Sequence, residues 1–190
     1  LVGSEMCIRD SSEVSNENQE EIATILEQTE KLDFLIQSLV KLSRMESGII
    51  AVHSEDTTIK QMLESIQQQF NVKVREKNIT LSLCDTDLHI RCDSKWTVEA
   101  LGNIVDNAIK YTACGGNVQI KVEQYSFFVK IDIIDDGIGI EKEEIPKIFG
   151  RFYRSLSVAD QPGVGIGLFL AREIIQVQKG YIKAVSYTHL

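Results

Sequence analysis

The N-terminal part of the chain carries apolar side chains at steps of three and four residues between Asn16 and Met45. The positions on this stripe are Ile22, Ile25, Leu32, Ile36 and Leu39, with Thr29 in line. This spacing predicts a long amphipathic helix with a heptad-like seam, which Ser15 and Asn16 can cap and Gly48 can end. Because one helix cannot bury such a stripe alone, we expect it to pack against a partner helix or to fold back on its own domain.

From residue 57 onward the pattern alternates between the period of helices and that of strands. Helices are predicted at 58–70 behind Thr57 or Thr58, at 93–111 with Asp93 as the cap, in a short segment after Glu141, and at 167–178. Strands are predicted at 79–83, 118–123, 127–134 and 181–185, the middle two pairing antiparallel around Tyr125 and Ser126. Helices mixed with antiparallel strands indicate an α+β fold, a two-layer α/β sandwich.

Composition narrows the class of protein without changing this picture. The chain has 190 residues, a formal net charge of -8, 43% hydrophobic residues and two prolines, which excludes collagen-like and broadly disordered chains. The acidic balance argues against nucleic acid as a partner. We expect no transmembrane segment, because no apolar run approaches the roughly 18 residues that crossing a bilayer needs. Four scattered cysteines, Cys7, Cys84, Cys92 and Cys114, indicate reduced thiols in a cytoplasmic protein.

The two ends of the chain, residues 1–11 and 185–190, lack any hydrophobic period. They resemble strings that translated sequencing adapter would leave at the ends of unrelated sequences. We expect both to be non-native tails. A natural tail without structure is the alternative interpretation.

The first candidate chemical motif lies on the helix predicted to end at Tyr111. Asn103, Asn107 and Lys110 are spaced by four and three residues and therefore share one helical face. Amide oxygens are hard ligands that suit magnesium, and an ammonium group suits phosphate oxygens. A solvated helix face carries the same residue types, so this motif alone does not decide between the two.

Two further motifs follow the predicted hairpin. Asp135-Asp136-Gly137-Ile138-Gly139 comes directly after a strand, where glycines allow close approach to a flat ligand and a carboxylate can accept a hydrogen bond from an exocyclic amine. An ordinary turn at the end of a strand looks similar. The segment from Ile148 to Arg154 then combines aromatic rings with two guanidinium groups, which can clamp phosphate or simply pack a helix end on the core.

The fourth motif, Gly163, Gly165 and Gly167 followed by Leu168, stands just before a predicted helix. Successive backbone amides at the start of a helix form an anion site that suits phosphate. No strand precedes these glycines and no Lys-Ser/Thr pair follows them, which excludes a dinucleotide fingerprint and a Walker-type loop.

In this order and spacing, the four motifs resemble the N box, first glycine box, F box and second glycine box of bacterial sensor histidine kinases. Residues 39–48 look like the end of the second helix of that family's dimerisation and phosphotransfer domain. The resemblance implies a Bergerat-type ATP-binding fold, with a mixed sheet on helices, at residues 57–184. It implies that residues 12–47 are the second helix of a dimerising helical hairpin, whose first helix is missing, and that residues 48–56 are a linker.

The same resemblance implies roles for individual residues. Asn107 matches the magnesium ligand, and Asp136 matches the carboxylate that binds the adenine amino group. Asn103 and Lys110 are the implied catalytic residues, and Arg154 is a candidate for the γ-phosphate. The implied ATP-binding set is Asn103, Asn107, Lys110, Tyr111, Asp136, Gly137, Gly139, Tyr153, Arg154, Gly163, Gly165, Gly167 and Leu168.

The chain departs from the family pattern at two places. The phosphoacceptor histidine with its following Pro-Leu is missing, and His53, His89 and His189 stand in positions that do not match it. Autophosphorylation of this chain on a matching histidine is therefore not expected. The last edge strand of the domain is expected to be replaced by the terminal tail, which would leave a sheet edge unpaired.

Several functions share this nucleotide fold. Gyrase-type, mismatch-repair and chaperone ATPases place a water-activating Glu four residues before the magnesium Asn, where this chain has Asn103, which cannot act as a general base. The resemblance therefore favours a protein-histidine kinase over such an ATPase or an anti-sigma serine kinase. A truncated module that binds ATP without transferring phosphate is the remaining rival.

The resemblance also implies partners and a location. They are a histidine phosphotransfer domain, a response regulator and, in the full-length protein, a second copy bound through the helical element. The fragment is expected in the cytoplasm, with its full-length parent anchored in the bacterial inner membrane.

Overall fold

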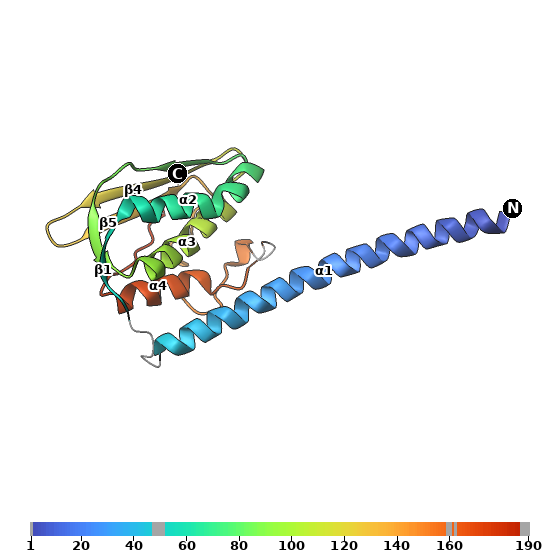
Figure 1. Ribbon diagram of the computed structural model, residues 1–190, viewed down its shortest axis with the longest axis horizontal. Helices are drawn as coiled ribbons and strands as arrows, with labels where there is room; N and C mark the ends of the chain where they lie inside the picture. Colours follow the sequence, from blue (N-terminus) through green and yellow to red (C-terminus); the bar gives the residue numbers. More distant parts are fainter. Residues whose placement is uncertain (1, 47–51, 159–160, 162, 187–190) are drawn as a thin grey trace. The chain divides into compact units, whose positions relative to one another are not determined.

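The computed structural model describes residues 2–46, 52–158, 161 and 163–186, and the chain divides into two compact units, Leu1–Arg44 and Met45–Leu190 (Figure 1). The helix α1, Val2–Glu46, of 45 residues, makes up the described part of the first unit and runs two residues into the second. The expectation that this helix starts at Asn16 is wrong, because Ser15 and Asn16 lie inside it. No proline interrupts the preceding residues, so the i to i−4 hydrogen bonds continue through them. Gly48, the predicted end, lies outside the described residues.

The seam predicted on α1 is open to solvent within this chain. Its members Ile22, Ile25, Leu32, Ile36 and Leu39 are all exposed. Thr29, in line with them, donates from Oγ1 to the carbonyl of Ile25 at 2.8 Å and so adds no apolar surface. The stripe is thus available to a partner helix, and its burial in a dimer stays a prediction.

The second unit contains two small sheets. In one, β1 (Glu55–Thr58) pairs antiparallel with β3 (His89–Cys92). In the other, β2 (Thr80–Leu83) pairs parallel with β4 (Asn117–Gln124), which pairs antiparallel with β5 (Val129–Asp135). The predicted hairpin of β4 and β5 is confirmed, closed by a hydrogen bond from Tyr125 N to Phe128 O at 2.9 Å.

Three helices lie together on one side of the strands in Figure 1. They are α2 (Ile59–Glu76), α3 (Ser94–Tyr111) and α4 (Gly167–Val177). Apolar faces of α2 and α3 meet the inner faces of β4 and β2 in one core, which includes Ile66, Val105 and Ile120, all almost fully buried. This helix layer on a mixed sheet confirms the expected two-layer α+β fold.

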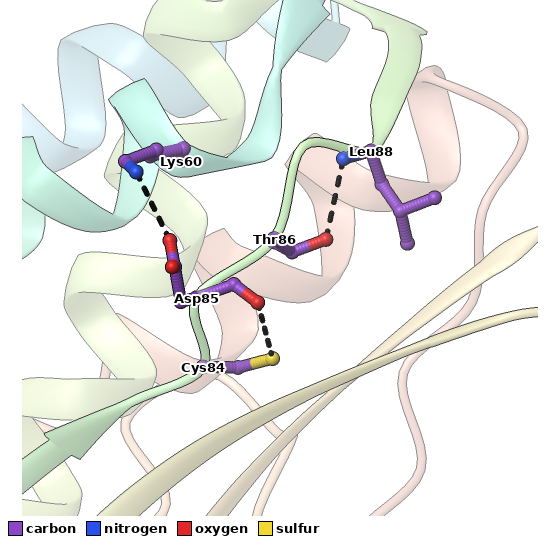
Figure 2. Close-up of polar contacts among 5 residues, drawn as sticks. All are labelled: Lys60, Cys84, Asp85, Thr86 and Leu88. Atoms are coloured by element: carbon purple, nitrogen blue, oxygen red, sulfur yellow. Dashed lines mark hydrogen bonds and ion pairs between the residues drawn. The ribbon is translucent and has the colours of Figure 1, made fainter.

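The connection between β2 and β3 is tied to the start of α2, as Figure 2 shows. Nζ of Lys60 lies 3.0 Å from Oδ1 of Asp85, and the backbone N–H of Ile59 donates to the carbonyl of Leu88 at 3.0 Å. Within the loop, Leu88 N donates to Oγ1 of Thr86 at 3.2 Å. These contacts fix the loop that leads into β3 and then α3.

The structure differs from the expectations in the last third of the chain. Residues 142–149, predicted as a short helix after Glu141, form consecutive turns instead, with Ile145 N and Ile148 N still reaching carbonyls four residues back at 3.2 and 3.0 Å. Residues 181–186 form no strand, although 181–185 were predicted as one. Only a short 3-10 helix, Leu156–Val158, interrupts the polar stretch before α4 within the described residues.

Candidate functional site

The helix α3 places Asn103, Asn107 and Lys110 on one side. Asp93 caps the helix, its Oδ1 accepting from Trp96 N at 3.1 Å, as predicted. The opposite face packs into the core with Ala100, Leu101, Val105, Ala108 and Ile109. The three polar residues are therefore half-buried on the side away from the core. Nδ2 of Asn103 donates to its own helix, to Glu99 O at 3.0 Å.

The segment of the second glycine motif runs against this face of α3. A Cβ added to Gly163 would lie 2.8 Å from Nζ of Lys110, and one added to Gly167 would lie 3.0 Å from Oδ1 of Asn103. Gly163 also has a φ of +140°, which side chains rarely adopt. The backbone of this segment thus lies directly over Lys110 and Asn103.

Lys110 is held beside Tyr111. Its Nζ lies 3.1 Å from Oη of Tyr111 and 4.8 Å from the centroid of the Tyr111 ring. A cation over a phenol ring is attracted by the ring's negative face. The pair therefore presents an ammonium group and an aromatic surface together, next to Gly163.

The first glycine motif approaches the same end of α3. A Cβ on Gly137 would lie 2.7 Å from the carbonyl oxygen of Tyr111, so only glycine allows this backbone contact. Gly139 has a φ of +73°, and the hydroxyl of Ser186 accepts from the N–H of Ile140 at 2.9 Å. Residue 186, expected to belong to a non-native tail, therefore touches the loop that follows the motif.

The two aspartates of this motif have different surroundings. Asp136 turns toward β4, where Oδ1 accepts from Asn117 N and Oδ2 accepts from Asn117 Nδ2, both at 2.8 Å. These bonds, the backbone one first, hold the pKa of Asp136 below its ordinary value. Asp135 instead continues the alternation of Ile131 and Ile133, which pack against the core.

Asp135 thus extends the face of β5 that looks toward the helices, and its Oδ1 accepts from Gly137 N at 3.0 Å. The family resemblance implied Asp136, not Asp135, as the adenine-binding carboxylate. The signal was available, because the spacing Asp-x-Gly-x-Gly begins at Asp135. The alternation of apolar residues along β5 points to the same carboxylate.

The aromatic and basic segment meets the second glycine motif through its backbone. A Cβ on Gly165, whose φ is +78°, would lie 2.5 Å from the carbonyl oxygen of Tyr153. Oη of Tyr153 donates to Oε1 of Glu144 at 3.0 Å, and desolvation followed by this bond raises the tyrosine pKa. Arg154 donates to the carbonyls of Val158, at 2.9 Å, and Gln161.

The structure therefore brings most of the predicted site residues together through direct approaches between their segments. Arg154 is engaged with the backbone of the polar stretch, and Leu168 lies half-buried in the first turn of α4. Asn107 lies between Asn103 and Lys110 on the face of α3. No cluster of three or more His, Cys, Asp or Glu side chains able to hold a metal occurs among the described residues.

Two of the three histidines fall in the described part of the chain. The backbone N–H of His53 donates to Oδ2 of Asp93 at 3.0 Å, just before β1. His89 lies in β3 with Nδ1 3.1 Å from Oδ2 of Asp56. His189 lies outside the described residues, so the structure does not test the prediction that it is not the phosphoacceptor.

The sequence model of the family described as "Histidine kinase-, DNA gyrase B-, and HSP90-like ATPase" matches residues 92–188. The sensor histidine kinase WalK of Bacillus subtilis is 32% identical over 164 residues, covering 84% of this chain and 27% of the relative. The sensor protein kinase PmrB of Pseudomonas aeruginosa is 28% identical over 153 residues, covering 80% of this chain and 32% of the relative.

Solved structures give the same result. The histidine kinase AdeS of Acinetobacter baumannii matches with a TM-score of 0.66 and 25% identity, over 82% of this chain and 72% of that one. The mycobacterial sensor histidine kinase MprB matches with a TM-score of 0.59 and 26% identity, over 67% of this chain and 81% of that one. The present chain spans about a third or less of the length of the two curated relatives named above.

The fold, the converging segments and the matched residues define the class: the chain belongs to the histidine kinase-, DNA gyrase B- and HSP90-like ATPase family. Within that family, it carries the ATP-binding domain of a sensor histidine kinase, since the relatives and structural neighbours named above are sensor kinases. Membership implies ATP binding. In the described part of the chain, the helices are too short or too polar to cross a membrane.

Proposed function

We propose that residues 57–184 bind magnesium-ATP and transfer its γ-phosphate to a histidine of a phosphotransfer domain, for relay to a response regulator. The observation that carries the proposal is the convergence of glycine backbone on α3. Gly163 approaches Nζ of Lys110, Gly167 approaches Oδ1 of Asn103, and Gly137 approaches the backbone carbonyl of Tyr111 at a distance that leaves no room for a side chain. Backbone amides beside an ammonium group suit a polyphosphate.

The proposed phosphate-binding groups are Lys110 and the amides of Gly163, Gly165 and Gly167, with Asn103 beside them. Leu168 follows them in the first turn of α4, where helix amides point toward the same segment. Arg154 is the proposed contact to the γ-phosphate, which requires it to exchange its bonds to Val158 and Gln161 for bonds to phosphate oxygens. Tyr153 fixes the backbone on which Gly165 rests.

The donor set on α3 fits a magnesium ion that is held largely by the nucleotide. Asn107 would supply one amide oxygen, and phosphate oxygens and water are the other ligands that Mg²⁺ usually takes in proteins. When bound, the ion neutralises charge on the transferring phosphoryl group. The lack of an acidic cluster among the described residues agrees with an ion that arrives with ATP.

We assign the adenine amino group to the first glycine motif. Asp136 is the residue that the family resemblance suggested, but Asn117 occupies both of its oxygens. Asp135 lies on the helix-facing side of β5 and holds Gly137 N, so its second oxygen is the better placed acceptor. Gly137 and Gly139 would leave room for the base because they have no side chains. Tyr111, the last residue of α3, lies next to Gly137.

The two aspartates form a matched pair for calorimetry. Asp135→Asn should weaken ATP binding by about tenfold or more, because the acceptor of a charge-assisted hydrogen bond becomes neutral. Asp136→Asn should leave ATP binding within about threefold of the wild type while lowering stability at neutral pH. The reverse ranking of the two variants would return the adenine contact to Asp136.

Phosphoryl transfer fits the site better than hydrolysis. In transfer, a histidine nitrogen attacks the γ-phosphorus as the bond to the bridging oxygen breaks, ADP leaves with the electron pair, and the ring proton passes to solvent. An ATPase needs a base to activate water, and Asn103 has no proton-accepting side chain. His53 and His89 do not match the position of the family's phosphoacceptor, and Nδ1 of His89 lies 3.1 Å from Oδ2 of Asp56. The acceptor histidine is therefore proposed to belong to a separate phosphotransfer domain.

The decisive experiment supplies that domain. The chain is mixed with labelled ATP, magnesium and a purified histidine-bearing phosphotransfer domain, and the label on the acceptor is followed with time. We expect slow labelling that is abolished in Asn107→Ala and in an acceptor whose histidine is replaced. Tight ATP binding with no label on any acceptor tested would replace the kinase by an ATP-binding module.

Two further proposals concern the parent protein. We propose that the exposed seam on α1, which includes Ile22, Ile25 and Ile36, packs against helices of a second copy. Because the chain spans about a third or less of WalK and PmrB, its parent is proposed to carry the sensor and an inner-membrane anchor in the remainder. The fragment itself is proposed to act in the cytoplasm, with no nucleic-acid partner.

A further inference from the structure

The end of α3 is held by a side chain from another helix. After Tyr111 the chain turns into an extended conformation at Thr112, with φ −77° and ψ 138°, so no glycine cap covers the last carbonyls. Nζ of Lys77 fills this role. It donates to the carbonyls of Ile109 at 3.0 Å, Lys110 at 2.7 Å and Thr112 at 3.1 Å.

The geometry uses the whole donor capacity of the lysine. An ammonium group has three donors, and here each has one carbonyl acceptor. Lys77 is half-buried at the end of α2, where its own N–H bonds to Lys73 O at 3.1 Å. Its carbonyl accepts from Gly115 N at 2.9 Å. The side chain and the backbone of Lys77 therefore both form hydrogen bonds with the segment that joins α3 to β4.

The end of α3, to which Lys77 donates these hydrogen bonds, carries two residues of the proposed nucleotide site. Lys110 approaches Gly163 with its ammonium group, and the Tyr111 carbonyl lies against Gly137. Helix carbonyl ends carry partial negative charge, and the Lys77 ammonium offsets that charge close to where a phosphate would bind. We propose that Lys77 is a positioning residue for the nucleotide, acting through Lys110; this inference rests on the proposed function.

A matched set of variants in the full chain tests the inference. Lys77→Met removes all three hydrogen-bond donors, and Lys77→Arg keeps a positively charged group with several donors. Lys73→Met is the control, because Lys73 also joins α2 to α3, through Asp106, but lies away from the end of α3. Affinity for a fluorescent ATP analogue is measured with magnesium, at a temperature where thermal unfolding shows every variant to be folded.

We expect Lys77→Met to weaken analogue binding by about tenfold, which is the effect of losing one charge-assisted hydrogen bond from Lys110 to the nucleotide. Lys77→Arg and Lys73→Met should stay within about threefold of the wild type. In a Lys110→Met background, Lys77→Met should have almost no further effect, because both changes disable the same group. If Lys77→Met does not fold, Lys77→Gln is measured against the same expectations.

A merely structural role predicts a different outcome. Lys77→Met would then lower the unfolding temperature and leave the affinity of the folded protein unchanged, which overturns the inference. Full additivity with Lys110→Met overturns it as well. A wild-type chain that binds no nucleotide overturns the proposed function and this inference with it, whereas a wild type that binds as tightly as Lys77→Met overturns the inference alone.

Discussion

The close approach of Gly165 to the Tyr153 backbone yields a prediction with an internal control. Alanine at Gly165 meets two penalties, a φ of +78° and a Cβ 2.5 Å from Tyr153 O and 2.9 Å from Phe152 C. Alanine at Gly115 meets the first penalty alone, because its φ is +81° and nothing lies within 4 Å of the added Cβ. The pair therefore separates backbone strain from steric overlap.

The magnitudes follow from the two penalties. Left-handed backbone costs about 1–2 kcal/mol for a residue with a Cβ, and this is the expected loss of unfolding free energy in Gly115→Ala. Overlap with main-chain atoms, which cannot rotate away, adds about 1–3 kcal/mol in Gly165→Ala. The lower entropy of the unfolded chain affects both variants alike and cancels in their difference.

The assay is urea unfolding followed by circular dichroism, with ATP affinity measured on the folded proteins. Gly165→Ala should be less stable than Gly115→Ala by about 1–3 kcal/mol. It should also bind ATP at least about tenfold more weakly, because the glycine segment that it displaces carries the proposed phosphate site. Equal stability and equal affinity in the two variants would refute the contact between Gly165 and Tyr153.

Three further predictions concern the framework around the site. Asp93→Ala should lower the free energy of unfolding by about 1–3 kcal/mol in urea titrations, because the α3 cap and the acceptor of His53 N–H disappear together; Asp93→Asn should lose less. The pKa of Asp136 is lowered in the folded protein, so its carboxylate stabilises the fold above the unfolded pKa of about 4. This stabilisation is lost as the pH falls through the lower folded pKa. The difference in free energy of unfolding between the wild type and Asp136→Asn should therefore disappear on acidification. A gap that widens toward low pH would contradict the bonds from Asn117. Ile66→Ala should cost about 2–5 kcal/mol, since the side chain is 0% exposed, whereas Phe127→Ala at 98% exposure should stay within about 0.5 kcal/mol; similar losses from both would mean that the core is placed wrongly.

The helix that carries the site could be predicted from the sequence in detail. An Asp at the cap, a 3.6-residue apolar period and polar residues on one stripe together determine the ends of α3 and the side on which Asn103 and Lys110 lie. The hairpin of β4 and β5 was equally evident, because two alternating runs flank a short polar turn. Local pattern is sufficient where local contacts decide the structure.

Features that depend on distant partners were missed or misjudged. The strand β1 has the sequence Glu-Asp-Thr-Thr, without alternation, and exists because it pairs with β3 far along the chain. Residues 181–185 show the alternation of a strand but find no ladder partner in the described structure. The hydrogen bonds from Asn117 to Asp136 and from Lys77 to the end of α3 likewise join segments that lie far apart in the sequence. Their spacing along the chain does not predict these contacts.

The central claim is that α3 and the glycine segments form one site for magnesium-ATP. Calorimetric titration of the intact chain with ATP and magnesium tests it directly. We predict a single site of micromolar affinity, roughly −6 to −8 kcal/mol, whose affinity falls by at least about tenfold in Lys110→Met while the protein stays folded. A folded chain that releases no binding heat and shows no ATP-dependent rise in unfolding temperature would contradict the claim.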